Sequence, residues 1–202
     1  MASDHYFAPE PAVPSARRTV RLELPDLTAV LASDRGVFSA DHVDPGTKLL
    51  LLEAPAPAAD APVDLLDLGC GYGPIAVTLA RRAPAATVWA VDVNQRALAL
   101  CAENAAAAGA GGVRAVAPDD VPDGVRFAGI WSNPPVRVGK PALHALLGRW
   151  LGRLAPGGRA WLVVRRDLGA DSLARHLVAS GHPTERLVSR AGYRILEVGA
   201  RA

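Results

Sequence analysis

The sequence has few cysteines and no metal-binding pattern. Only Cys70 and Cys101 occur among the 202 residues, too few for a disulfide framework, and their spacing matches no zinc site. Cys70 lies inside a glycine-rich segment, where a crosslink would hinder the approach of a ligand. The five histidines show no spacing typical of ligands, so we expect no metal. A reducing, cytoplasmic environment is therefore expected.

The sequence also lacks the marks of a secreted or membrane protein. Residues 1–6 have neither the basic start nor the apolar run of a signal peptide, and the leucine run at 49–52 ends at Glu53. We therefore expect a soluble protein with no membrane partner. The formal net charge of +2 and the pI of about 8.8 permit nucleic-acid binding without indicating it.

Length and proline distribution indicate one α/β domain with an N-terminal extension. A chain of 202 residues can bury the core of a single such domain. Residues 1–53 are expected to form an extension that is part of the same domain. Within it, segments 18–24 and 27–32 have the pattern of strands separated by a short turn, which predicts a β-hairpin. Residues 54–62 are an alanine- and proline-rich linker, and 63–202 are expected to form the core.

From residue 63 onward, strand patterns alternate with helix patterns. The predicted strands of this region are 63–68, 87–91, 113–117, 127–131, 159–164, 186–189 and 193–198. The predicted helices are 75–82, 95–108, 141–154 and 170–180. Asn94 is the expected N-cap of the second helix. The alternation predicts a Rossmann-like α/β fold with a seven-stranded, mostly parallel sheet and helices on both faces. The last two strands are joined by three residues, so they should form an antiparallel C-terminal hairpin.

A glycine-rich segment follows the first strand of this sheet and precedes a helix. It reads Asp-Leu-Gly-Cys-Gly-Tyr-Gly, and its candidate site residues are Asp67, Gly69, Gly71, Tyr72 and Gly73. Glycines in this position let the backbone approach a ligand that faces the helix N-terminus. The glycines occur at every second position, unlike the dinucleotide pattern, which favours a different nucleoside. A tight turn without a ligand is the alternative.

Asp92 supports a nucleoside at this position. It ends the second strand of the sheet, 23 positions after Gly69. A carboxylate at that place can accept hydrogen bonds from both hydroxyls of a ribose. The glycine segment and Asp92 together therefore predict a nucleoside-binding site at one edge of the sheet.

A Ser-Asn-Pro-Pro segment at the end of a later strand suits an amine substrate. An exocyclic amine on a purine is a poor nucleophile because its lone pair is delocalised into the ring. The Asn133 side-chain oxygen and the Pro134 carbonyl can accept its two N–H protons, while Pro134 and Pro135 hold the loop. Methylation makes such a nitrogen acidic, so positioning matters more than a strong base. The two segments predict an amine methylase, and a strand-terminating turn is the alternative.

These segments resemble the motifs of class I S-adenosylmethionine-dependent methyltransferases. Residues 67–73 are similar to the first motif of that superfamily, and residues 91–94 are similar to its ribose-binding strand end. The resemblance implies S-adenosylmethionine as the cofactor and adds Val93 and Asn133 to the cofactor-binding candidates. It also implies that Asp119 or Asp120 lies near the adenine.

Other segments resemble a small-domain group that includes ribosomal RNA small-subunit guanine-N2 methyltransferases. These segments are 36–39, 132–140 and 192–194. The resemblance spans most of the chain and implies a methyltransferase core at 63–202, methylation of guanine N2 and ribosomal RNA or the small ribosomal subunit as partner. The candidate substrate-binding residues are Phe38, Val136, Arg137 and Lys140.

Several alternatives remain open at this point. Amine methyltransferases often have an aromatic residue where this sequence has Val136, so Phe38, Tyr6 or Phe7 could stack on the base instead. Trp131 is expected to pack in the core. The substrate could instead be DNA adenine, a protein or a small molecule, and an inactive, cofactor-binding RNA partner is a further alternative. A nicotinamide-dependent oxidoreductase is disfavoured by the glycine spacing and the terminal hairpin.

Overall fold

The computed structural model describes residues 10–201, and two sheets and five α-helices lie within this range. The strands of the main sheet are β3 (Asp64–Leu68), β4 (Thr87–Val91), β5 (Val113–Val116), β6 (Phe127–Ser132), β7 (Leu154–Arg165), β8 (Thr184–Arg190) and β9 (Tyr193–Gly199). The smaller sheet consists of β1 (Arg18–Leu24) and β2 (Leu27–Ser33). The helices are α1 (Pro45–Glu53), α2 (Pro74–Arg82), α3 (Gln95–Ala107), α4 (Lys140–Leu151) and α5 (Ala170–Ala179). Short 3-10 turns are η1 (Pro118–Asp120), η2 (Val136–Val138) and η3 (Arg166–Leu168).

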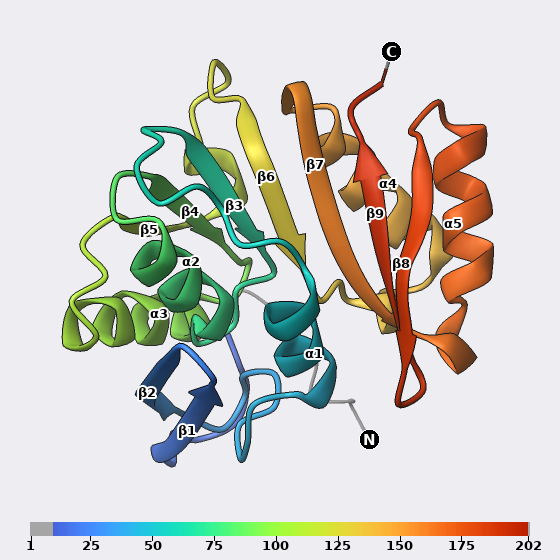
Figure 1. Cartoon of the computed structure of the whole chain (residues 1–202). Coiled ribbons are helices and arrows are strands. Elements are labelled where there is room, and N and C mark those ends of the chain that lie inside the picture. The colour runs from blue at the N-terminus through green and yellow to red at the C-terminus, as the bar shows by residue number, and fades with distance from the viewer. Residues whose placement is uncertain (1–9, 202) are drawn as a thin grey trace.

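The main sheet has the strand order β5-β4-β3-β6-β7-β9-β8 (Figure 1). Neighbouring strands from β5 to β7 are parallel, whereas β9 is antiparallel to both β7 and β8. The chain proceeds outward from β3 through β4 to β5, and then in the opposite direction from β6 to β7. In open α/β sheets, ligands bind beyond the carboxyl ends of the strands where the order reverses, which here is between β3 and β6. The predicted fold and C-terminal hairpin are confirmed.

Successive side chains of the strands point to opposite faces and bury two apolar layers. Helices α1, α2 and α3 cover one face, and α4 and α5 cover the other (Figure 1). On β3, Leu65 belongs to the first layer and Leu66 to the second, as the two-residue period of a strand requires. Trp131 and Trp161 pack against each other in the first layer with ring centroids 4.5 Å apart and ring planes tilted by 33°. Trp131 is therefore a core residue, as expected.

The N-terminal hairpin packs on the same face as α3. Strands β1 and β2 pair antiparallel, and Val20, Leu22 and Leu31 are buried in the layer that contains α2 and α3. The alternate positions Thr19 and Arg21 are exposed. The hairpin thus adds apolar contacts to the core, and its predicted strands are confirmed to within one residue.

Helix α1 was not predicted from the sequence. Asp44 caps its N-terminus by accepting the Thr47 backbone N–H at 3.0 Å, and Pro45 occupies the first turn. Leu49, Leu50 and Leu51 are all buried. The three adjacent leucines are all buried because the helix lies between the sheet and the N-terminal hairpin, and only a narrow side with Lys48 and Leu52 is exposed. The cap and the first-turn proline were the clearest local signs of this helix.

Two other boundaries differ from the sequence prediction by more than two residues, whereas the rest of the predicted elements agree to within one or two. The helix expected at 141–154 ends at Leu151, and the strand expected from 159 begins at Leu154. The residues from Leu154 onward pair with β6 through an irregular register. The Pro156-Gly157-Gly158 segment within them is typical of a turn, so the start of the strand was not predicted. None of the helices in the described part of the chain is long and apolar enough to cross a membrane.

Candidate active site

A cavity of about 500 Å³ opens at the carboxyl edge of the sheet. Its volume falls within the range of small-molecule sites, roughly 300–1,000 Å³. The register of β3 and β6 brings the two sequence motifs to the cavity, because Leu68 pairs with Ser132 and the next residues are Gly69 and Asn133. Ser132 Oγ donates a hydrogen bond to the Leu68 carbonyl at 2.7 Å. The glycine loop and the Asn-Pro-Pro loop therefore start side by side.

The glycine loop presents bare backbone to the cavity. Gly69 and Gly71 line the cavity and have φ values of +77° and +54°, which L side chains rarely adopt. A Cβ atom at either position would enter open space, with no atom of the described residues within 4 Å apart from the glycine's own chain neighbours. At Gly73 a Cβ would instead lie 2.7 Å from Cys101 Sγ, so this glycine permits close packing of α2 on α3. The first two glycines leave room for a ligand, and the third shapes the fold.

Asp67 is completely buried at the end of β3. Its Oδ2 accepts the Ala76 N–H from the first turn of α2 at 2.9 Å, whereas its Oδ1 has no hydrogen-bond partner among the described residues. Burial raises the pKa of Asp67 to about 8, the Ala76 N–H opposes that shift, and the nearby Asp92 charge adds to it. The carboxyl group is therefore predominantly protonated at neutral pH, beneath a loop that faces the cavity.

Asp92 lines the cavity at the end of β4. One carboxylate oxygen accepts the Gly71 N–H at 2.9 Å and the other accepts the Asn94 N–H at 2.9 Å. Burial raises the pKa of Asp92, and the backbone N–H groups partly offset this effect. Each oxygen retains a second lone pair for a ligand hydroxyl, so the glycine loop and β4 are tied together without exhausting the carboxylate.

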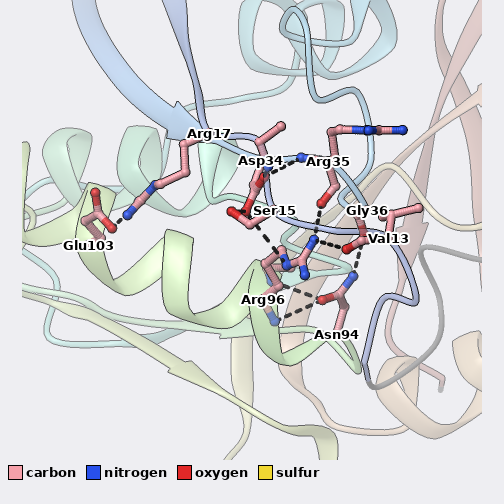
Figure 2. Close-up of polar contacts among 11 residues, drawn as sticks. Val13, Ser15, Arg17, Asp34, Arg35, Gly36, Asn94, Arg96 and Glu103 are labelled. Carbon is pink, nitrogen blue, oxygen red and sulfur yellow. Dashed lines mark hydrogen bonds and ion pairs between the residues drawn. The ribbon is translucent and has the colours of Figure 1, made fainter.

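A polar network ties the loop after β2 to the N-terminus of α3 (Figure 2). Arg96 Nη1 donates hydrogen bonds to the carbonyls of Val13 at 3.1 Å and Arg35 at 2.6 Å. Asn94 caps α3 as predicted, and its Nδ2 donates to the Gly36 carbonyl at 2.8 Å. The loop that leads to Phe38 is therefore held beside the end of β4.

Asp34 fastens the N-terminal segment onto this loop (Figure 2). It accepts the Ser15 hydroxyl at 2.6 Å, the Ala16 N–H at 2.5 Å and the Arg35 N–H at 2.7 Å. Burial alone would raise the pKa of Asp34, but these hydrogen bonds lower it overall. The loop is thus held from both sides.

The Asn133 side chain is held by helix α1. Its Nδ2 donates to Asp44 Oδ1 at 2.8 Å and to Thr47 Oγ1 at 3.1 Å. A carboxylate has no hydrogen to donate, so the amide nitrogen, and not the oxygen, must face Asp44. Among residues 10–201, none donates a hydrogen bond to the Asn133 amide oxygen. Asn133 and Asp44 both line the cavity, which leaves that oxygen as an acceptor for a ligand.

The residues after Asn133 continue the cavity wall. Pro134, Pro135 and Val136 all line it. The Pro134 carbonyl accepts the Val136 N–H at 2.8 Å and keeps a second lone pair. Two acceptors, one on a side chain and one on the backbone, therefore follow the end of β6.

Three aromatic residues lie at the cavity, and Trp150 is the fully buried one. Phe38 lines it and is 37% exposed, and Tyr193 lines it from the start of β9. A Cβ atom at Gly46 would lie 2.7 Å from Tyr193 Cε1, so the tyrosine ring packs directly on the first turn of α1. Burial raises the pKa of Tyr193, and the charge of Asp44 adds to the shift. Tyr6 and Phe7, the other aromatic candidates, lie outside the described residues.

The remaining site predictions divide between the cavity and its surroundings. Val93 and Arg137 line the cavity, whereas Lys140 is an exposed residue at the start of α4. Tyr72 is buried beneath the glycine loop, and its hydroxyl donates to the His42 carbonyl at 3.3 Å. It contributes to a smaller pocket that adjoins the loop and Asn133.

The two aspartates expected near an adenine do not line this cavity. Pro118 does, but Asp119 has a side chain 90% exposed and pairs with Arg149 at 2.9 Å. Asp120 is also exposed. Their proposed adenine contact stays a prediction.

Sequence reasoning missed three residues of the site. Asp44 is the N-cap of the unpredicted helix α1, Thr47 lies in its first turn and lines the smaller pocket, and Tyr193 was noted only as part of a similar segment. The Asp44-Pro45 pair reads as an N-cap followed by a first-turn proline, which is a helix start signal. No local pattern could connect that signal to Asn133, 89 residues away.

The fold and the cavity define a class I S-adenosylmethionine-dependent methyltransferase. The sheet order, the antiparallel C-terminal hairpin and the glycine loop at the carboxyl edge are the features of that class. A family model described as the methyltransferase small domain matches residues 28–197, and the chain belongs to this family.

Three comparisons illustrate the range of similar proteins. The uncharacterized protein YbxB of Bacillus subtilis is 34% identical over 198 residues, which cover 96% of this chain and 98% of that protein. Ribosomal RNA small subunit methyltransferase C of Pseudomonas aeruginosa is 34% identical over 192 residues, 92% of this chain and 55% of that one. The solved structure of the Thermus thermophilus 16S rRNA N2 G1207 methyltransferase, in complex with AdoMet and guanosine, matches with a TM-score of 0.79 at 26% identity. The match covers 95% of this chain and 52% of that chain. The chain thus spans about half of these two named RNA methyltransferases.

Proposed function

We propose that this methyltransferase acts on an exocyclic amine of an RNA base, with guanine N2 of ribosomal RNA as the target. The observation that carries the proposal is the orientation of the Asn133 amide, whose nitrogen is engaged by Asp44 and Thr47. Its oxygen and the Pro134 carbonyl form two adjacent acceptors. Two acceptors match the two N–H groups of an amine, whereas a hydroxyl has one hydrogen to donate and a ring carbon has none.

The residues at the other end of the cavity fit S-adenosylmethionine. We infer that the backbone of Gly69 and Gly71 lies against this cofactor, because side chains there would fill the open space. Asp92 and Val93 would meet the ribose and the base, since Asp92 keeps lone pairs for two hydroxyls. Asp67 Oδ1, to which none of the described residues donates a hydrogen bond, is buried beneath the same loop. A cationic ligand above it would favour the ionised form of this carboxyl group.

The chain itself contributes positioning. When bound, the cofactor supplies an electrophilic methyl group on a sulfonium centre. Asn133 and Pro134 hold both amine N–H groups, which turns the nitrogen lone pair out of conjugation with the ring. Positive charge develops on the nitrogen as the new bond forms. Both hydrogen bonds therefore strengthen in the transition state, and this differential binding accelerates the reaction.

RNA is the substrate class that the relatives favour. Two of the similar proteins are named as RNA methyltransferases, and one was solved with guanosine. Arg137 and Arg165 line the cavity, where their charges could meet phosphates. Phe38 and Tyr193 offer aromatic faces to a base. The match to nearly the full length of YbxB, an uncharacterized protein, leaves the particular nucleotide to experiment.

The proposal is tested by methyl transfer to defined substrates. Purified enzyme is incubated with labelled S-adenosylmethionine and small ribosomal subunits that lack the modification, or with naked ribosomal RNA, DNA or total protein. RNA is then digested to nucleosides and separated. We expect label in N2-methylguanosine, which forms about 100-fold or more slowly with the Asn133→Ala variant.

Other products would correct the proposal at different levels. Labelled N6-methyladenosine would retain the amine chemistry but change the base. A labelled 2′-O-methyl nucleoside would reject the amine. Label in protein or in a metabolite, with none in RNA, would reject RNA as the substrate.

A further inference from the structure

Asp44 holds two groups with one carboxylate oxygen. Its Oδ1 accepts the Thr47 backbone N–H at 3.0 Å, which caps α1, and it also accepts Asn133 Nδ2 at 2.8 Å. Thr47 Oγ1 accepts the same Nδ2 at 3.1 Å, and Thr47 is 4% exposed. The start of α1 is therefore joined to the loop after β6 by side-chain contacts.

We propose that Asp44 is a positioning residue for methyl transfer, which fixes the Asn133 amide with its oxygen toward the substrate and polarises it. The inference rests on the proposed amine chemistry, and it assigns a role to a residue outside both sequence motifs. Asp44 acts through Asn133 and does not need to contact the substrate amine itself.

The first part of this role is the choice between two amide orientations. An asparagine amide turned by half a revolution exchanges its oxygen and nitrogen, and the nitrogen would then face the substrate as a donor. A donor cannot hold an amine N–H. Thr47 Oγ1 does not decide the orientation, because a hydroxyl can both donate and accept. Asp44 does decide it, because a carboxylate only accepts.

The second part is electrostatic. In a chain of hydrogen bonds, the bonds polarise one another, and each is strengthened by roughly 10–30%. A negative charge at the amide nitrogen side increases electron density on the amide oxygen, which strengthens its bond to an N–H group that becomes more positive. The Tyr193 ring packs on Gly46 beside Asp44 and reduces the space for water there. Lower local polarity makes the charge more effective.

Three substitutions separate these contributions from the helix cap. Asp44→Ser keeps an oxygen that can cap α1 but is too short to reach Asn133. Asp44→Asn keeps an oxygen for both hydrogen bonds and removes the charge. Asp41→Asn is the matched control, because Asp41 lies in the same loop, is exposed, and pairs with Arg18.

The kinetic readout is the rate of methyl transfer to RNA under saturating conditions. For Asp44→Ser we expect kcat to fall about 100-fold, and for Asp44→Asn about 5-fold, with KM for RNA and Kd for S-adenosylmethionine within about twofold of wild type. Asp41→Asn should match wild type. A merely structural role predicts that kcat falls equally in the Asp44→Ser and Asp44→Asn variants, in proportion to the drop in melting temperature, or that KM for RNA rises. Either result, or an unchanged kcat in Asp44→Ser, would overturn the inference.

A second readout does not need a substrate. The Asn133 side-chain NH2 group gives a pair of signals in a ¹⁵N–¹H spectrum, which the Asn133→Ala variant identifies. We expect slow hydrogen exchange at this group in wild type and Asp44→Asn, and fast exchange in Asp44→Ser. Fast exchange in wild type would refute the positioning. If the wild-type enzyme methylates no RNA but exchange is slow, the proposed function fails while the Asp44–Asn133 contact stands.

Discussion

The glycine loop and the Asn-Pro-Pro loop follow adjacent strands, but their functional groups are held by different means. On the glycine side, Asp92 accepts a hydrogen bond from the Gly71 N–H, only 21 positions away in the sequence. On the Asn-Pro-Pro side, Asn133 is held by Asp44 and Thr47, which lie 89 and 86 positions away. The first side is a local β-α-β unit, whereas the second is assembled from the N-terminal helix, β6 and the C-terminal hairpin.

This contrast indicates a division of labour between the two sides. The glycine side offers backbone groups and buried carboxyl groups to the cavity. Such groups suit a ligand that does not differ between relatives. The Asn-Pro-Pro side has exposed residues on η2 and η3 around two acceptors, and such loops can differ between relatives while the sheet stays constant. Substitutions on the two sides should therefore separate cofactor affinity from turnover.

The sharpest test of the division is Asn133→Ala. Removal of one acceptor for the amine should lower kcat by about 100-fold or more, because the bond is strongest in the transition state. The Kd for S-adenosylmethionine, measured by calorimetry, should stay within about threefold of wild type. A large loss of cofactor affinity in this variant would break the comparison, because it would place Asn133 on the cofactor side.

The reciprocal test is Asp92→Ala. Loss of a charged acceptor for ribose, and of the tie to the Gly71 N–H, should raise the cofactor Kd by about 10- to 100-fold. The stabilisation that wild type gains from cofactor, about 2.7 kcal/mol at a hundred times Kd, should fall to between about 0.4 and 1.4 kcal/mol at the same concentration. Asp64→Asn is the control, because Asp64 lies at the opposite end of β3 and bonds only Trp89 among its described partners. Equal Kd values for Asp92→Ala and wild type would contradict the assignment.

The glycine side was also the part that sequence reasoning described best. Its signals are local: β3, the glycine loop and α2 are consecutive, and Asn94 caps α3 two residues after Asp92. The strand β4 was predicted with its observed limits, because a short apolar run between turns leaves little choice. Local patterns suffice where all parts of a site lie within a few dozen residues.

The Asn-Pro-Pro side could be predicted only in part. Asn133, Pro134 and Val136 were identified, but the groups that orient Asn133 were not. Helix α1 exposes only a narrow side, which includes Lys48 and Leu52, because Leu49, Leu50 and Leu51 are buried by the sheet and the hairpin. Tyr193 reaches the cavity only because β9 returns antiparallel beside β7. Such contacts follow from the tertiary fold, which a single sequence does not contain.

A smaller effect is expected in the pH dependence of stability on the glycine side. The pKa of Asp67 is about 8 in the folded protein and near 4 when unfolded, so the folded state binds more protons between these values. The contribution of Asp67 to the free energy of unfolding is greatest below pH 4, where the carboxyl group is protonated in both states. This contribution is lost as the pH rises toward 8. Between pH 6 and 7.5, this should lower the free energy of unfolding by up to about 1.4 kcal/mol per pH unit. Urea unfolding of the ligand-free protein measures the slope.

Asp67→Asn isolates this contribution. The asparagine resembles the protonated carboxyl group and can still accept the Ala76 N–H. Both proteins share the titration of the histidines. Its effect therefore cancels when the slope of unfolding free energy against pH for this variant is subtracted from that of wild type. Asn133→Ala should retain the wild-type slope, since Asn133 does not titrate. Parallel curves for wild type and Asp67→Asn would show that Asp67 does not change its protonation on folding.

The smallest expected effect is on the Asn-Pro-Pro side, at the contact of α1 with β9. In Gly46→Ala the new Cβ would lie 2.7 Å from Tyr193 Cε1 and 2.9 Å from Asp44 Oδ1. The tyrosine ring must move, at a cost of about 1 kcal/mol in the free energy of unfolding. In a Tyr193→Ala background the same substitution should cost less, because the ring is absent. A double-mutant cycle by urea unfolding measures this coupling, and additive effects would mean that α1 and β9 do not form this wall together.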